Sequence, residues 1–520
     1  MSELERTIPE VMIDAAEQYA GLPALVEGDV VLSYSDLLDR ALRAGAVLAS
    51  MGIGKGDRVG IWLPNSSAWV EAALGVLFIG AVVVPLNTRL KAQEAAYILR
   101  KSRARIVVAA GQFLGVDYTE IVKSVDLPHL LRCIRALPGA GQSDEWQDAL
   151  TAATQSECEL VLQAGKQVRR DDLAEIMFTS GTTGFPKGAM LHHGQIIRTY
   201  SIWATSTAVR RGDRYMIIAP MFHSFGFKAG VLASILKGAA MYPVKTFDVP
   251  AVLKAIEAER ITTMGGPPTI FISLLELNRS AKRDISSLRS ISTGGGMVPP
   301  HMIRALQGDV GVEVVCNAYG LTESCALATV TRQGDDAEHI AVSAGSPLEG
   351  VEIRCVGPDG NEVPTGEAGE VQVRGFNVMS GYFDDPAGTE AVMTADGWLR
   401  TGDVGIIDQR GCLRITDRIK DMFIVGGFNC YPAEIEKIIL DYPAVSEVAV
   451  IGVADERLGE VCKAFVVPSG GPAFDAEAFI AWCRANMGNY KVPRYVQAMD
   501  ALPRNALGKV EKFKLRANAS

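Results

Sequence analysis

The chain has 520 residues, of which 48% are hydrophobic and 21% charged, so we expect a globular protein with more than one domain. The formal net charge is −9 at pH 7. A protein that binds nucleic acid needs a basic surface, and no dense run of lysine and arginine occurs along the chain. We therefore expect no nucleic-acid partner.

Membrane insertion and secretion are also disfavoured. The apolar run from Ala72 to Pro85 is too short to span a bilayer, and a buried helix leading into a parallel strand explains it better. The first 20 residues contain several acids and no apolar core, so we expect no signal peptide there. The nine cysteines are scattered and include no C-x-x-C pair, which predicts neither a zinc site nor disulfides. Together these features predict a cytoplasmic protein without a transmembrane segment.

Apolar runs alternate with amphipathic stretches, which predicts an α/β fold with largely parallel sheets. Expected strands include 58–63, 104–110, 215–219 and 312–316, and residues 249–260 have helical spacing. Short strands between turn residues predict a β-rich subdomain at about 345–419. The order helix, strand, strand, helix predicts a small, mobile α+β C-terminal domain at 420–520, after an N-terminal domain at 1–419.

The segment from Thr179 to Gly188, TSGTTGFPKG, carries the strongest local signal. It follows a predicted strand and combines hydroxyls, glycines and Lys187, groups that can surround phosphate oxygens. The spacing is not that of a Walker loop. An ordinary surface turn rarely combines so many hydrogen-bond donors with a lysine, so we expect a phosphate-binding loop.

This loop resembles that of the adenylate-forming enzymes, the family that includes acyl-CoA synthetases, peptide-synthetase adenylation domains and firefly luciferase. Further segments resemble the family's motifs in the same order along almost the whole chain. They are PMFHSFGF (220–227), STGGG (292–296), NAYGLTE (317–323), TGD (401–403), DRIK (417–420), GGFNCYPAE (426–434) and PRNALGK (503–509).

The resemblance implies an ATP-dependent carboxylic acid:CoA ligase that forms an acyl-adenylate and then an acyl-thioester, with ATP, Mg²⁺ and coenzyme A. Glu323 would hold Mg²⁺, Thr322 would bind the α-phosphate, and Tyr319 would stack on adenine. Asp403 and Arg418 would bind the ribose. The other implied cofactor-binding residues are Thr179, Ser180, Gly181, Thr182, Thr183, Lys187, Gly294, Gly295, Gly296, Asn317, Ala318 and Gly320.

Three further positions are implied near the C-terminus. Lys509 would reach the α-phosphate and the substrate carboxylate during adenylation, and Lys420 would be the hinge of a domain rotation. That rotation would withdraw Lys509 and present a pantetheine tunnel beside Gly426 and Gly427. A lone lysine or a turn aspartate would otherwise be unremarkable, so these roles rest on the resemblance.

The acyl pocket would be mostly apolar, with His223 either gating the path to the adenylate or packing as a core histidine. Amino-acid-activating relatives place an aspartate after the phenylalanine where this chain has His223, so we expect an uncharged hydrophobic acid. His192 and His193 are expected to be structural. The implied pocket residues are His223, Phe225, Phe227, Lys228, Gly266, Pro267, Gly296 and Tyr319.

Several segments resemble actinobacterial ligases that activate steroid-ring-derived propanoates, including 223–230 and 424–430. Ile424 and Asn429 depart from the plant hydroxycinnamate ligases. The substrate is expected to be a fatty acid or a ring-bearing propanoate. Alternatives are an aryl-acid CoA ligase, an acyl-AMP ligase that loads a carrier protein, and a nucleotide-binding protein without catalysis. The sequence leaves open a homodimer.

Overall fold

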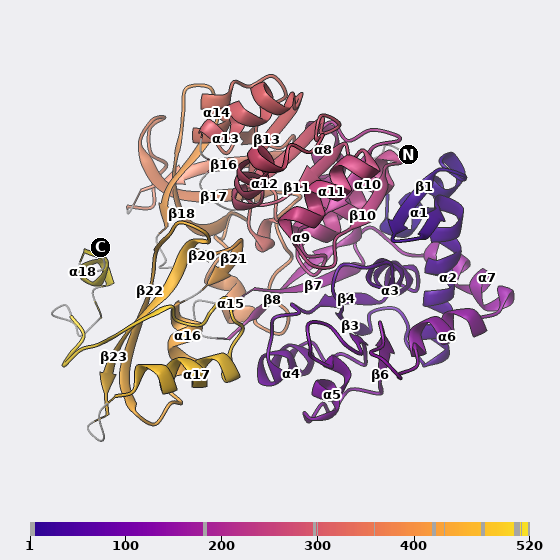
Figure 1. The fold of residues 1–520 in the computed structure, drawn as a ribbon, viewed down its shortest axis with the longest axis horizontal. Coiled ribbons are helices and arrows are strands. Elements are labelled where there is room, and N and C mark those ends of the chain that lie inside the picture. Colours follow the sequence, from indigo (N-terminus) through magenta and orange to yellow (C-terminus); the bar gives the residue numbers. More distant parts are fainter. Residues whose placement is uncertain are drawn as a thin grey trace.

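The computed structural model describes residues 6–179, 185–294, 298, 300–357, 359–418, 423–430, 432–469, 474–503, 510 and 512–517. Two large α/β sheets form most of the molecule, and a β-rich unit and a small α+β unit follow them in the chain (Figure 1). The predicted α/β fold, with a large N-terminal domain and a smaller C-terminal domain, is confirmed. The predicted boundary at 419 and 420 lies outside the described residues.

The first sheet has six strands in the order β6-β5-β3-β4-β7-β8. All neighbours are parallel except β7 and β8, which form an antiparallel pair on either side of the phosphate-loop segment. The strands are β3 (Arg58–Trp62), β4 (Val82–Pro85), β5 (Ile106–Ala110), β6 (Arg132–Ala136), β7 (Leu173–Thr179) and β8 (Lys187–His192). The helices between them are α2 (Tyr34–Ser50), α3 (Ser67–Phe78), α4 (Ala92–Lys101), α5 (Tyr118–Lys123), α6 (Glu145–Ala152) and α7 (Gln155–Gly165), with α1 (Ile8–Gln18) preceding them.

Helix α3 explains the apolar run that starts at Ala72. Nearly all its residues are buried, and Gly75 packs so closely on Gly45 of α2 that a side chain would meet backbone atoms at 2.7 Å. The chain then enters β4, whose four residues are all buried between parallel neighbours. The predicted buried helix and strand are thus present. Within the described ranges, no helix is long and apolar enough to cross a membrane.

The second sheet has nine strands in the order β15-β14-β13-β12-β11-β9-β10-β1-β2. Its centre is parallel, so the carboxyl ends of β12 and β13 lie at one edge, where the chemistry-bearing segments begin. The strands are β1 (Pro23–Glu27), β2 (Val30–Ser33), β9 (Arg214–Ile217), β10 (Ala240–Pro243), β11 (Thr263–Gly265), β12 (Ser290–Gly294), β13 (Val314–Tyr319), β14 (Thr329–Val330) and β15 (Ser346–Pro347). Associated helices are α8 (His193–Ser206), α9 (Ser224–Gly226), η2 (Phe227–Leu232), α10 (Ala233–Lys237), α11 (Val249–Glu259), α12 (Pro268–Ala281), α13 (Pro300–Ala305), η3 (Leu306–Val310), η4 (Thr322–Ser324) and α14 (Ala337–Val342).

Two smaller sheets complete the fold. A four-stranded antiparallel sheet contains β16 (Val351–Val356), β17 (Ala368–Gly375), β18 (Leu399–Ile407) and β19 (Leu413–Arg418), with α15 (Pro386–Glu390) between β17 and β18. The C-terminal sheet contains β20 (Phe423–Val425), β21 (Phe428–Cys430), β22 (Val445–Asp455), β23 (Gly459–Pro468) and β24 (Tyr495–Ala498). Its helices are α16 (Pro432–Ile439), α17 (Ala476–Asn486) and α18 (Lys512–Ala517). This unit, orange to yellow in Figure 1, has its own apolar core and sits on the side of the body that carries α4 and α15.

Candidate active site

Glu323 lies in η4, directly after β13. Its Oε1 atom accepts a hydrogen bond of 2.7 Å from the hydroxyl of Tyr382 and one of 3.4 Å from Oγ1 of Thr179. Thr179 is the last residue of β7, so the end of the first sheet and the end of the second meet at this carboxylate. The predicted metal-binding and phosphate-binding segments are therefore adjacent.

Lys187 opens β8 on the far side of the phosphate-loop segment. Its ammonium lies 3.7 Å from Oδ2 of Asp385 and 5.1 Å from the ring centre of Tyr382. Two positions before Lys187, Phe185 stacks on Tyr97 of α4, with ring centres 5.0 Å apart. Tyr382 therefore contacts both the Lys187 ammonium and the Glu323 carboxylate, an arrangement that suits a site for an anionic ligand together with a cation.

Tyr319 ends β13, and its hydroxyl donates a 2.7 Å hydrogen bond to Oδ2 of Asp403 in β18. Asp403 pairs in register with Arg418 across β18 and β19. An aromatic ring beside an acceptor carboxylate suits a nucleoside, whose base stacks and whose ribose hydroxyls donate. The sequence placed these residues 84 positions apart, and the fold brings them into contact.

Two glycines at this edge leave no room for side chains. A Cβ on Gly294 would lie 2.6 Å from the carbonyl oxygen of Ala318, and one on Gly320 would lie 2.4 Å from the backbone nitrogen of Leu327. Glycine here permits close backbone packing beside the predicted nucleotide site. Asn317, by contrast, is largely buried and uses its amide to bind the carbonyl oxygens of Ile340 and Ser343, so it braces the pocket wall.

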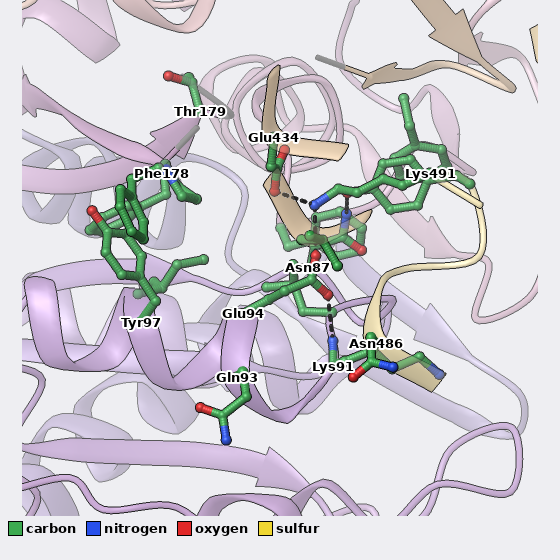
Figure 2. A pocket seen from close by; sticks show the side chains of 18 of the residues that line it. Asn87, Lys91, Gln93, Glu94, Tyr97, Phe178, Thr179, Glu434, Asn486 and Lys491 are labelled. Carbon is green, nitrogen blue, oxygen red and sulfur yellow. Dashed lines mark hydrogen bonds and ion pairs between the residues drawn. The ribbon is translucent and has the colours of Figure 1, made fainter. Parts of the chain in front are cut away.

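A cleft of about 640 Å³ leads from Thr179 and Thr322 to the junction with the C-terminal unit (Figure 2). At one end it is lined by Thr179, Thr322 and His223. At the other it runs between α4 and the C-terminal residues Gly427 and Tyr490. The cleft is therefore open to the predicted phosphate site at one end and bounded by two separate units of the chain at the other.

His223 caps the short helix α9, and its Nδ1 atom accepts a hydrogen bond from the backbone nitrogen of Phe225 at 3.2 Å. Loss of hydration around the ring lowers the pKa of His223 below its usual range, and the nearby Lys228 ammonium lowers it further, although the side chain is exposed where it borders the cleft. The His223 side chain is exposed at the cleft wall and is not packed as a core histidine, and its gating role stays a prediction. Phe225 packs against Trp203 with ring centres 5.9 Å apart.

Phe227 and Lys228, expected in the acyl pocket, turn into the core instead. Phe227 packs on Trp69 with ring centres 4.9 Å apart. The Lys228 ammonium is fully buried, 2.5 Å from Oε2 of Glu175 and 3.0 Å from Oγ of Ser224. Because η2 starts at Phe227 with every residue buried, these side chains support the pocket from behind. Gly266 and Pro267 follow β11, and a Cβ on Gly427 would meet Pro267 at 3.1 Å.

The residues fit a magnesium ion that is held mainly by phosphate oxygens. No group of three or more His, Cys, Asp or Glu side chains suited to a metal occurs in the ranges that the structure describes. Glu323 supplies one carboxylate beside the hydroxyl of Thr179. Magnesium is typically bound by one or two carboxylates, phosphate oxygens and water, so this donor set suits it.

The sequence missed several residues of this region. The hydroxyl of Tyr382 contacts Glu323, and Lys491 bridges Glu94 of α4 and Glu434 of α16, as Figure 2 shows. A tyrosine after a loop glycine, or a lysine in an exposed-looking Tyr-Lys-Val-Pro segment, gives no periodic signal. Other predicted residues lie outside the described part of the chain: Ser180, Gly181, Thr182, Thr183, Gly295, Gly296, Lys420 and Lys509.

Comparisons with known proteins agree with this geometry. The model of the AMP-binding enzyme family matches residues 13–383, and that of the AMP-binding enzyme C-terminal domain matches residues 434–509. The chain therefore belongs to the AMP-binding enzymes. The activity predicted from the sequence, an ATP-dependent carboxylic acid:CoA ligase that uses ATP, Mg²⁺ and coenzyme A, is confirmed at the level of the family.

Two relatives carry the name 3-[(3aS,4S,7aS)-7a-methyl-1,5-dioxo-octahydro-1H-inden-4-yl]propanoyl:CoA ligase. The protein of Rhodococcus jostii is 41% identical over 99% of both chains, and that of Mycobacterium tuberculosis is 42% identical over 98% of both. Among solved structures, an o-succinylbenzoate CoA synthetase of Bacillus subtilis, bound with a product analogue, is 29% identical over 99% of both chains with a TM-score of 0.85.

Proposed function

We propose that the acid activated by this enzyme is a propanoate attached to a fused, partly oxidised carbocyclic ring system. The observation that carries the proposal is full-length identity of 41–42% to two relatives named for such a substrate. The chain's own residues support it, because His223, Ser224 and Phe225 offer no carboxylate to an amino group and the surrounding wall is mostly apolar.

The proposed chemistry has two steps. In the first, a carboxylate oxygen of the acid attacks the α-phosphorus of ATP and pyrophosphate leaves. Lys187 and Lys509 offset negative charge, Thr322 binds the α-phosphate, and bound Mg²⁺ supplies charge neutralisation on the phosphates beside Glu323. Tyr319 and Asp403 orient the adenosine, with Arg418 as the second ribose partner.

In the second step, the thiol of coenzyme A attacks the acyl carbonyl, a thioester forms and AMP leaves. The cleft between α4 and Gly427 supports a path for the pantetheine arm, since it ends beside Thr322 and His223. The proposed rotation about Lys420 withdraws Lys509 and opens this path.

We also propose a cytoplasmic location, in keeping with the nine cysteines, which are all free thiols. The assembly that we propose is a homodimer, which light scattering would test.

The test is pyrophosphate release and thioester formation over a panel of acids, with wild type and Lys509→Ala. The panel contains bicyclic ring propanoates, aryl acids, and short, medium and long fatty acids. We expect CoA-dependent thioester from ring propanoates, and a variant that loses adenylation but still converts supplied acyl-AMP. Preference for fatty or aryl acids would refute the substrate. Pyrophosphate release without CoA-dependent thioester would instead indicate a carrier-loading ligase.

A further inference from the structure

The loop between β17 and α15 is bound to both halves of the proposed ATP site. The backbone nitrogen of Met379 donates to the carbonyl oxygen of Glu323 at 2.8 Å, and that of Phe383 donates to the carbonyl oxygen of Gly188, also at 2.8 Å. Tyr382 forms an antiparallel bridge with Ala189 of β8. The loop is therefore fixed to Glu323 of η4 and to β8, the strand that follows the phosphate loop.

From this position the side chain of Tyr382 contacts both Glu323 and Lys187. Its hydroxyl donates to Oε1 of Glu323 at 2.7 Å, and its ring lies under the ammonium of Lys187 at 5.1 Å. Tyr382 is only 7% exposed, so water competes little with either contact. Asp385, from the same loop, completes the surroundings of Lys187 at 3.7 Å.

Hydrogen bonds to one oxygen of a carboxylate restrict how the group presents its other oxygen. The hydrogen bonds from Tyr382 and Thr179 to Oε1 of Glu323 restrict the rotation of the carboxylate, and Oε2 would be the oxygen offered to a cation. Neighbours that orient a metal ligand in this way typically change metal affinity or activity 10- to 100-fold when they are altered. The ring contact would at the same time keep the Lys187 charge close to the phosphates.

We propose that Tyr382 is a positioning residue for the adenylation step. Its hydroxyl presents the Glu323 carboxylate to the metal that accompanies ATP, and its ring keeps the Lys187 ammonium beside the phosphates. This inference rests on the proposed function. It assigns a role to a loop outside the phosphate-loop and η4 segments, and it separates the hydroxyl, which serves Glu323, from the ring, which serves Lys187.

The experiment measures Mn²⁺ binding to the complex of the enzyme with a non-hydrolysable ATP analogue, by the electron paramagnetic resonance signal of free Mn²⁺. Tyr382→Phe is expected to raise the Mn²⁺ dissociation constant about tenfold or more and to leave metal-free nucleotide affinity within about twofold. Tyr382→Leu, which also loses the ring, is expected to weaken metal-free nucleotide binding as well.

Two controls separate positioning from general destabilisation. Tyr34→Phe removes a buried hydroxyl that donates to the carbonyl oxygens of Ser234 and Ala239, so it should lower the melting temperature without changing Mn²⁺ binding. The double variant Tyr382→Phe with Glu323→Gln should bind Mn²⁺ no more weakly than Glu323→Gln alone. An unchanged Mn²⁺ dissociation constant in Tyr382→Phe, or fully additive effects in the double variant, overturns the proposal. Failure of the wild type to bind Mn²⁺ with the analogue overturns the proposed function as well.

Discussion

Glu94→Gln is expected to slow thioester formation selectively. Glu94 belongs to α4 of the large body, and it accepts a 2.8 Å hydrogen bond from the ammonium of Lys491, which belongs to the C-terminal unit. Lys491 also binds Glu434 of its own unit at 2.6 Å. Glutamine has nearly the shape of glutamate but no charge. The variant therefore removes the negative charge that faces the Lys491 ammonium across the boundary between the two units.

The structure sets the size of the effect. The side chains of Lys491, Glu94 and Glu434 are 3%, 10% and 6% exposed, so solvent screens the contact little. Burial alone would lower the pKa of Lys491, but Glu434 and the other nearby groups, Glu94 among them, raise it well above its usual range, so the ammonium stays charged. A hydrogen bond to a charged group contributes about 1.5–3 kcal/mol, and about 1.4 kcal/mol is a tenfold change in an equilibrium. We call the arrangement in which Lys491 of the C-terminal unit contacts Glu94 of α4 the docked arrangement. In Glu94→Gln its population relative to any other arrangement should fall about 10- to 100-fold.

The assay measures the two half-reactions separately. Thioester formation from supplied acyl-AMP and CoA should fall about tenfold or more in Glu94→Gln, while acid-dependent exchange of pyrophosphate into ATP stays within about twofold. Folding of the C-terminal unit should be unchanged, because the Lys491–Glu434 pair remains. Glu120→Gln is the matched control, since Glu120 pairs with Lys123 on the exposed surface and such pairs contribute little.

Equal slowing of both half-reactions would refute the reasoning, because it would mean that the contact serves general stability. An unchanged thioester rate would refute it in a different way. In that case the charge on Glu94 would contribute nothing to the arrangement of the two units.

Three further predictions follow from buried or paired groups. Lys228→Met should lower the free energy of unfolding by about 3–5 kcal/mol, because it leaves the Glu175 carboxylate buried without its partner. The double variant with Glu175→Gln should recover most of the loss, and urea unfolding measures both variants. Burial lowers the pKa of His193 from 6.5 to about 3, so the unfolded chain takes up the proton first. The free energy of unfolding should then fall by up to about 1.4 kcal/mol per pH unit as the pH drops from 6.5 towards 3. The melting temperature of His193→Asn should depend less steeply on pH over that range than that of the wild type. Asp403→Asn should raise the KM for ATP about tenfold with a smaller change in kcat, since ribose hydroxyls lose a charged acceptor, and initial rates at varied ATP check this.

Local patterns were enough to predict the order of the fold. Residues 249–260 have apolar positions at helical spacing, and α11 spans Val249–Glu259 after the capping side chain of Asp248. The predicted strand at 312–316 begins later, at Val314, and continues to Tyr319, because its parallel pairing with β12 extends to Ala318. Periodicity locates an element, while partner strands set its ends.

The site was predictable only where a motif carries its chemistry. Glu323 and Asp403 stand out in their motifs, yet nothing local shows that Asp403 receives the hydroxyl of Tyr319. Lys228 was expected in the pocket because the resemblance to the family implied it. Its direction depends on Glu175, 53 positions earlier in the chain, and a pair that distant leaves no mark on spacing. The same reason hides the contact between Glu94 and Lys491.

The cleft has walls from two units that are far apart in the chain, α4 on one side and the segments around Gly427 and Tyr490 on the other. A small molecule that touches both walls would bind only the docked arrangement and would stabilise it at the expense of every other. Such a molecule would hold the C-terminal unit against α4. It would arrest the enzyme between its half-reactions without resembling ATP or the acid.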